Sequence, residues 1–149
     1  TNQRKIMELT KEYVLEQLFD YGNVEYIVEL IPNKLYVTIR TLTPDDYKKL
    51  DNKMMSLEGD KVTKLQYWQQ YILERLSMAL LRYKDKEFKT SEEAKEFLNT
   101  LSSIVVDKLY QELIQLEKKV KEFIGYEEVD KNFFQGGVSQ IKPEQSQKE

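Results

Sequence analysis

The stretch that decides the fold is residues 24–46, with the sequence VEYIVELIPNKLYVTIRTLTPDD. Residues 31–34, Ile-Pro-Asn-Lys, indicate a turn, because proline presets φ and asparagine tolerates turn conformations between two β-rich runs. Folding the chain at this turn predicts a β-hairpin over residues 24–42. Its predicted cross-strand pairs, counted outward from the turn, are Ile31 with Lys34, Leu30 with Leu35, Glu29 with Tyr36, Val28 with Val37, Ile27 with Thr38, Tyr26 with Ile39, Glu25 with Arg40 and Val24 with Thr41. A slip of one residue would turn one strand over and break its apolar face, so the pattern favours this register.

The hairpin leads directly into the start of a helix. Thr43 supplies an N-cap hydroxyl, and Pro44 fits the first helical position. Asp45 and Asp46 then place two carboxylates at the positive end of the helix. We therefore predict a helix over residues 44–57. Its apolar positions are Tyr47, Leu50, Met54 and Leu57.

Apolar periodicity predicts four more helices, and hence a mostly α (α+β) fold. Their predicted ranges are 2–19 before Gly22, 61–83 capped by Asp60, 90–101 with a capping box at Thr90 and Glu93, and 103–124 before Gly125. The charged segment 84–89 is predicted to be a loop. We expect residues 1–125 to form a single helical bundle of about five helices with one β-hairpin. Residues 126–149 have no hydrophobic period and are expected to form a mostly flexible polar tail.

The predicted first and third helices each allow two interpretations. The first is expected to pack on the core, and the alternative is an arm exchanged with a neighbouring subunit. The third carries a broad apolar stripe of Leu65, Trp68, Ile72, Leu76, Ala79, Leu80 and Tyr83. Trp68 with Tyr67 and Tyr71 could form a base-stacking platform, but the arginines of such sites are missing nearby. Core packing of Trp68 is therefore favoured, since aromatic side chains bury the largest area.

The predicted fifth helix carries an apolar seam with coiled-coil spacing. Its positions are Val106, Leu109, Leu113, Leu116, Val120 and Phe123, which step by 3, 4, 3, 4 and 3 residues. Fully burying six such side chains is worth roughly 9 to 18 kcal/mol before entropy, so the seam must pack on something. The third helix, a second copy of the chain and a client protein are the alternatives. The predicted partner-binding residues are Leu109, Leu113, Leu116 and Val120 on this seam, and Phe133 and Phe134 in the tail.

Composition excludes several classes of function. The chain has 149 residues, and its 23 Lys and Arg against 26 Asp and Glu give a net charge of −3. Charges of both signs alternate along the helices, which argues against nucleic-acid binding. No run approaches 18 consecutive apolar residues and no signal-like N-terminus is present, which predicts a soluble protein without a membrane partner.

The sequence offers few side chains suited to catalysis. It contains neither His nor Cys, which excludes imidazole bases, Cys or Ser nucleophiles activated by His, and the usual zinc ligands. The pairs Asp45/Asp46 and Glu92/Glu93 could hold Mg²⁺, as in a metal-dependent nuclease, but each follows a Thr in a first helical turn, where capping explains it. We therefore expect no cofactor, no metal and no enzymatic activity.

Two stretches resemble a known family. They are YIVELIPNKLYVTIRTLTPDD, residues 26–46, and FLNTLSSIVVDKLYQELIQLEKKVKEFI, residues 97–124. Both are similar to the small tail or baseplate-hub assembly chaperones of tailed bacteriophages, in which a β-hairpin leads into a helical body closed by a helix of this kind. The resemblance covers about a third of the chain and carries over no catalytic residue.

This resemblance implies a non-enzymatic role in phage tail assembly in the cytoplasm of the host bacterium. The expected partner is a tail, hub or tape-measure protein, and a second copy of the chain, in a homo-oligomer, is the other candidate partner. The alternative is a structural or adaptor protein retained in the virion. A lone hairpin would expose two strand edges, to which a strand of a client or of another subunit could add.

Overall fold

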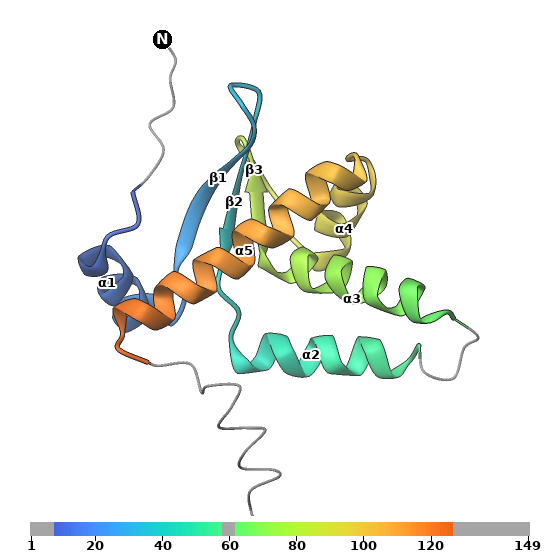
Figure 1. Cartoon of the computed structure of the whole chain (residues 1–149), viewed down its shortest axis with the longest axis horizontal. Coiled ribbons are helices and arrows are strands. Elements are labelled where there is room, and N and C mark those ends of the chain that lie inside the picture. The colour runs from blue at the N-terminus through green and yellow to red at the C-terminus, as the bar shows by residue number, and fades with distance from the viewer. Residues whose placement is uncertain (1–7, 58–61, 127–149) are drawn as a thin grey trace, which may run out of the picture.

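The computed structural model describes residues 8–57 and 62–126, which form five helices and one four-stranded antiparallel sheet (Figure 1). In chain order the elements are α1 (Lys11–Tyr21), β1 (Glu25–Ile31), β2 (Leu35–Arg40), α2 (Pro44–Met55), α3 (Lys64–Ala79), β3 (Leu80–Tyr83), β4 (Lys86–Glu87), α4 (Ser91–Asn99) and α5 (Ser103–Phe123). The predicted mostly α (α+β) class, with a β-hairpin, is confirmed. Of the predicted tail, residues 127–149 lie outside the described residues.

The hairpin of β1 and β2 has the predicted register along most of its length. Every predicted pair from Glu25–Arg40 to Glu29–Tyr36 is present. The predicted pairing of Leu30 with Leu35 is wrong, because a bulge makes Ile31 the partner of Leu35. The turn closes as expected, with the Lys34 N–H donating to the Ile31 carbonyl at 2.9 Å. Asn33 takes φ 64°, a left-handed conformation that asparagine tolerates better than most residues.

A second hairpin extends the sheet. We predicted a helix to residue 83 and a loop over 84–89, but α3 ends at Ala79, and Leu80 turns into the extended β3. β3 pairs antiparallel with β2, and β4 then pairs with β3. The edge of β2 offers backbone partners for Leu80–Tyr83, and this non-local pairing overrides the local helical period. The predicted lone hairpin with two open edges is therefore wrong, because β3 covers one of them.

Threonine caps determine where the first two helices begin. Thr43 and Asp46 form a complete capping box at α2, as the sequence indicates. Thr10 caps α1, so Glu8 to Thr10 precede the helix that we predicted from residue 2, and residues 2–7 lie outside the described residues. Val14 is the buried residue of α1, whereas Leu15 and Phe19 are exposed.

The caps of α3 and α4 differ from the prediction in detail. Thr63 caps α3 with Gln66 as its reciprocal partner, whereas the predicted cap, Asp60, lies outside the described residues. Thr90 caps α4 by accepting from the N–H of Glu93 at 3.2 Å. The Glu93 carboxylate accepts from the N–H of Lys89 and not from that of Thr90, so the predicted capping box is only half formed.

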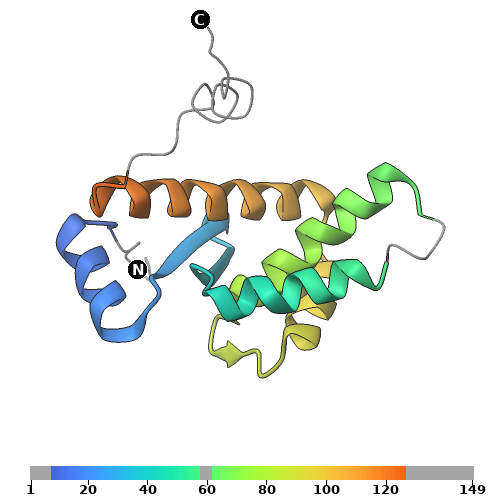
Figure 2. The same cartoon turned by 90° about the horizontal axis from the view of Figure 1, so that it is seen from below.

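α5 crosses one face of the sheet, with α1 beside its end and α3 beside its start (Figures 1 and 2). Its seam lies against the sheet in one continuous hydrophobic core. The helix ends in a Schellman motif at Gly125, which has φ 77°. Gly125 donates to the carbonyl of Glu122 at 3.1 Å, and Tyr126 to that of Lys121 at 2.9 Å. The predicted end of this helix at Gly125 is thus confirmed.

Candidate protein-binding surface

α2 and α3 form a helical pair that projects beyond the start of α5 (Figure 2). They are joined by a small hydrophobic cluster of their own, built on Leu50, Met54 and Met78. Tyr67 and Tyr71 on α3 pack against this cluster. The helix faces that point away from it are the surfaces that the pair offers to solvent.

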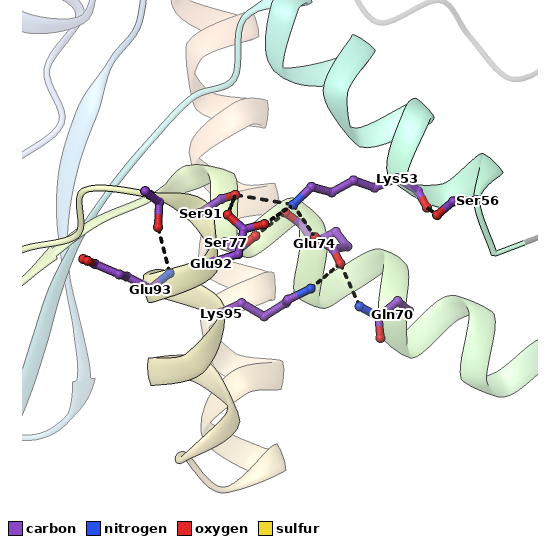
Figure 3. Close-up of polar contacts among 10 residues, drawn as sticks. Lys53, Ser56, Gln70, Glu74, Ser77, Ser91, Glu92, Glu93 and Lys95 are labelled. Atoms are coloured by element: carbon purple, nitrogen blue, oxygen red, sulfur yellow. Dashed lines mark hydrogen bonds and ion pairs between the residues drawn. The ribbon is translucent and has the colours of Figure 1, made fainter.

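A buried carboxylate ties this pair to α4 (Figure 3). Glu74 on α3 is 5% exposed and accepts hydrogen bonds from Lys95 Nζ at 2.6 Å and from Gln70 Nε2 at 2.8 Å. Lys53 Nζ on α2 lies 3.3 Å from its other oxygen, Oε1. Lys53 also donates to Glu92, in the first turn of α4, at 2.9 Å. Three helices are therefore held together by one network of alternating charges.

The network keeps both its acid and its base charged. Burial alone would raise the pKa of Glu74, but the hydrogen bonds from Lys95 and Gln70 and the charge of Lys53 outweigh burial and lower the pKa. Burial alone would lower the pKa of Lys53, yet its contacts with Glu92 and Glu74 raise it. The ion pairs therefore persist over the neutral pH range and fix the α2–α3 pair on the domain.

A second buried charge joins α3 to α5. Arg75 donates to Glu117 at 2.6 Å and to the hydroxyl of Tyr110 at 3.0 Å. Burial opposes the charge of Arg75, but the nearby Glu117 outweighs it and raises the pKa of the guanidinium. The Tyr47 hydroxyl on α2 lies 3.4 Å from the same guanidinium. The C-terminal half of α3 is thus held by α5 on one side and by α2 on the other.

The first half of the α3 stripe is exposed. Leu65 is 66% exposed and Trp68 is 53% exposed, so the predicted core packing of Trp68 is wrong. The reason is the length of α5: it begins at Ser103, which lines the same small cavity as Ile72, and so stops short of the earlier turns of α3. α2 packs on the Tyr67 and Tyr71 side of these turns and leaves Leu65 and Trp68 exposed. The ring of Trp68 contacts Tyr71 edge-on, with 5.5 Å between centroids. We call Leu65 and Trp68 the exposed stripe; Ile72, the next apolar residue of the series, is half-buried and packs against the core.

The exposed stripe leads into an open apolar cavity between α3, α4 and α5. The cavity has a volume of about 260 Å³. Its lining includes Ile72, Leu73, Leu98, Leu101 and Val106. An apolar side chain that packed beside Trp68 would therefore find a hollow one helical turn further along α3.

The four residues of α5 that the sequence predicted to bind a partner do not form part of this surface. Leu109, Leu113, Leu116 and Val120 are all buried in the core of the single chain, so their side chains are not on the surface of the folded domain. Phe133 and Phe134 lie outside the described residues. Sequence periodicity marked Leu65 and Trp68 as apolar but could not show that α5 stops short of them.

The two predicted carboxylate pairs act in capping and in ion pairs. Asp46 accepts from Arg40 at 2.6 Å and from the Thr43 N–H at 2.8 Å. Burial would raise the pKa of Asp46, but these bonds lower it. Asp45 pairs with Lys49 at 3.2 Å on the surface. Within residues 8–57 and 62–126, no three acidic side chains gather as a metal site would require.

No helix in the described part of the chain is both long and apolar enough to cross a membrane. Comparison of the chain with protein-family models, with curated proteins and with solved structures gives no match.

Proposed function

We propose that this protein is a non-enzymatic assembly chaperone for a tail or baseplate component of a tailed bacteriophage, and that it holds its client on the exposed stripe. The observation that carries the proposal is the solvent-exposed pair Leu65 and Trp68 beside an apolar cavity. Exposed tryptophan is common at protein interfaces, because its ring offers a large contact area at a small cost in conformational entropy.

The rigid attachment of α3 to its neighbouring helices supports this role. The ion pairs of Glu74 and Arg75 hold α3 on α2, α4 and α5, so the exposed aromatic surface is presented on a rigid element. An apolar segment of a client that is still unassembled can cover Leu65 and Trp68 and be released when the client meets its final neighbours. The resemblance of residues 26–46 and 97–124 to phage assembly chaperones indicates the class of client.

The test is co-expression of the full chain with tail, hub and tape-measure proteins of tailed phages. The chaperone is expected to keep one of them soluble and to co-purify with it. Leu65→Ser/Trp68→Ser should lower the amount of soluble client at least tenfold, while the melting temperature stays near that of the wild type because both side chains are exposed.

Phe19→Ser is the matched control. Phe19 is 92% exposed and lies on α1, which sits beside the end of α5 and not beside its start (Figure 2), so its loss should leave the client bound. Full client solubility with the Leu65→Ser/Trp68→Ser variant would contradict the proposed surface. A fixed copy number in purified virions would favour the alternative, a structural or adaptor protein that stays in the particle.

A further inference from the structure

β1 forms one edge of the sheet. Among the described strands, whose order is β1-β2-β3-β4, one side of β1 has no neighbour. The N–H of Thr41 donates to the carbonyl of Val24 at 3.0 Å, so the backbone groups of Val24 face β2. Because alternate residues of an antiparallel strand face its partner, Glu25, Ile27 and Glu29 direct their N–H and C=O groups away from the sheet.

Side chains from two helices close both ends of this edge. The Tyr13 hydroxyl on α1 donates to the carbonyl of Glu25 at 2.7 Å, and Gln17 accepts from the N–H of Glu25 at 3.3 Å. At the other end the bulge leaves Leu30 without a partner on β2, and Lys108 Nζ on α5 donates to its carbonyl at 3.1 Å. These contacts confirm the direction of the Glu25 backbone and stop strand pairing before Glu25 and beyond Glu29.

The middle of the edge is open. The described side-chain bonds to the backbone of β1 go to Glu25 and Leu30, and none reaches Ile27 or Glu29. α1 lies beside the start of β1 only (Figure 1). The edge between the two closed ends thus offers two donors and two acceptors, which a three- to five-residue extended segment could satisfy.

The outer face of β1 carries negative charge on both sides of Ile27. The N–H of Asn33 and the hydroxyl of Tyr36 both donate to the carboxylate of Glu29, which lowers the pKa of that residue. Glu25 lies on the same face, because residues two apart in a pleated strand share a face. Arg82 on β3, beyond β2, lies 3.7 Å from one oxygen of the Glu25 carboxylate, whose side chain is still 42% exposed. Opposite charges in facing positions of neighbouring strands stabilise pairing, and like charges oppose it.

We propose that this open edge binds an extended, basic segment of a client protein by strand addition, with client Lys or Arg side chains opposite Glu25 and Glu29. Backbone hydrogen bonds to Ile27 and Glu29 supply the attachment, and the two carboxylates select the segment. The inference rests on the proposed function and adds a second point of attachment, on a different part of the domain from the exposed stripe.

The probe is the capped peptide acetyl-Lys-Val-Lys-Val-Lys-Val-Lys-amide, added to the ¹⁵N-labelled full chain. The amide signals of Ile27 and Glu29 should shift, and their exchange with solvent should slow at least tenfold. The same peptide with Glu in place of Lys should bind roughly threefold more weakly or worse, because it faces Glu25 and Glu29 with like charges.

Ile27→Pro is the decisive variant. Proline removes an N–H that points away from β2, so the ladder of β1 and β2 remains, and proline is tolerated on edge strands for this reason. The variant should fold and lose the peptide, whereas Ile27→Val should fold and keep it. Peptide binding to Ile27→Pro at wild-type strength would overturn the inference, as would shifts confined to other parts of the protein.

Amide exchange in the wild type alone gives an independent answer should Ile27→Pro not fold. Protection of Ile27 and Glu29 without peptide would show that the edge is already covered by this chain or by a second copy, and would overturn the inference. The Leu65→Ser/Trp68→Ser variant separates the two proposals. If the client is lost by Leu65→Ser/Trp68→Ser but kept by Ile27→Pro, the strand-addition inference is refuted and the proposed function stands. If the wild-type chain holds no client at all, the proposed function itself is refuted.

Discussion

Glu74 is the residue on which three helices meet. It accepts from Lys95 and Gln70 and pairs with Lys53, and it is almost wholly buried. A buried charge of this kind contributes through its partners, since a carboxylate without them would be strongly destabilising. At the residue scale, stability therefore depends on the protonation state of this carboxylate.

Acid should weaken the domain through Glu74. Because its folded pKa lies below the ordinary 4.5, the unfolded chain binds the proton more readily than the folded chain does. The contribution of Glu74 is thus complete above about pH 4.5 and is lost as pH falls through the folded pKa. Glu74→Gln should cost about 1.5–3 kcal/mol at pH 7 and flatten the fall in stability toward pH 3.

Urea denaturation of the wild type and of Glu74→Gln at pH 7, 4.5 and 3 measures this effect. Glu96→Gln, at an exposed position on α4, is the control and should follow the wild type. Parallel pH profiles for the wild type and Glu74→Gln would mean that the titration of Glu74 contributes nothing to the acid sensitivity of the domain.

At the scale of the elements, α5 is held by tertiary packing and the hairpin turn by a local backbone preference. α5 is the longest helix; its seam covers the sheet, and its opposite face is exposed to solvent. The hairpin turn has a simpler determinant, since Asn33 alone takes a left-handed conformation between Ile31 and Lys34. Each of these elements yields a prediction that separates local from tertiary causes.

Substitutions on two faces of α5 should have opposite outcomes. Leu116 is 2% exposed, so Leu116→Glu buries an unpaired carboxylate and should cost about 3 kcal/mol or more, enough to unfold much of the protein. Ile104→Glu, in the first exposed turn of the same helix, should change stability by less than about 0.5 kcal/mol. Thermal melting and sedimentation measure both; a folded Leu116→Glu variant that loses a dimer would place the seam at an interface.

The hairpin turn should respond to the backbone preference of residue 33. Asn33→Val should lower stability by about 1–2 kcal/mol, because a β-branched side chain is strained at φ 64°. Asn33→Gly should leave stability nearly unchanged or raise it slightly, since glycine adopts positive φ freely. Equal melting temperatures for the two variants would show that the turn does not hold this conformation in solution.

At the scale of the whole molecule, one core connects the sheet with α1, α3, α4 and α5, and a smaller cluster holds α2 on α3. Described core residues extend as far as Phe123, and the Schellman motif at Gly125 then ends α5. The polar composition of residues 137–149 supplies no apolar period that would offset the entropy of ordering them.

A chain that ends at Gly136 should therefore fold as the full chain does. We expect its melting temperature to stay within about 2 °C of the full-length value, which corresponds to less than roughly 1 kcal/mol. Calorimetry of both proteins measures this. A fall of 10 °C would mean that the removed residues belong to the core.

The sequence by itself determined the local features of this protein. Turn chemistry placed the hairpin at Pro32 and Asn33, alternation set most of its register, and capping signals marked the starts of α2 and α4 and the end of α5. These features depend on residues close together in the chain, whose preferences are visible in the sequence. Only the tertiary structure decided that residues 80–83 leave a helical period to pair with β2, and that α5 ends before it can cover Leu65 and Trp68. Both outcomes depend on which distant element packs against the segment. Apolar periodicity is the same for a covered helix face and an open one, so the sequence could not show that Leu65 and Trp68 are exposed.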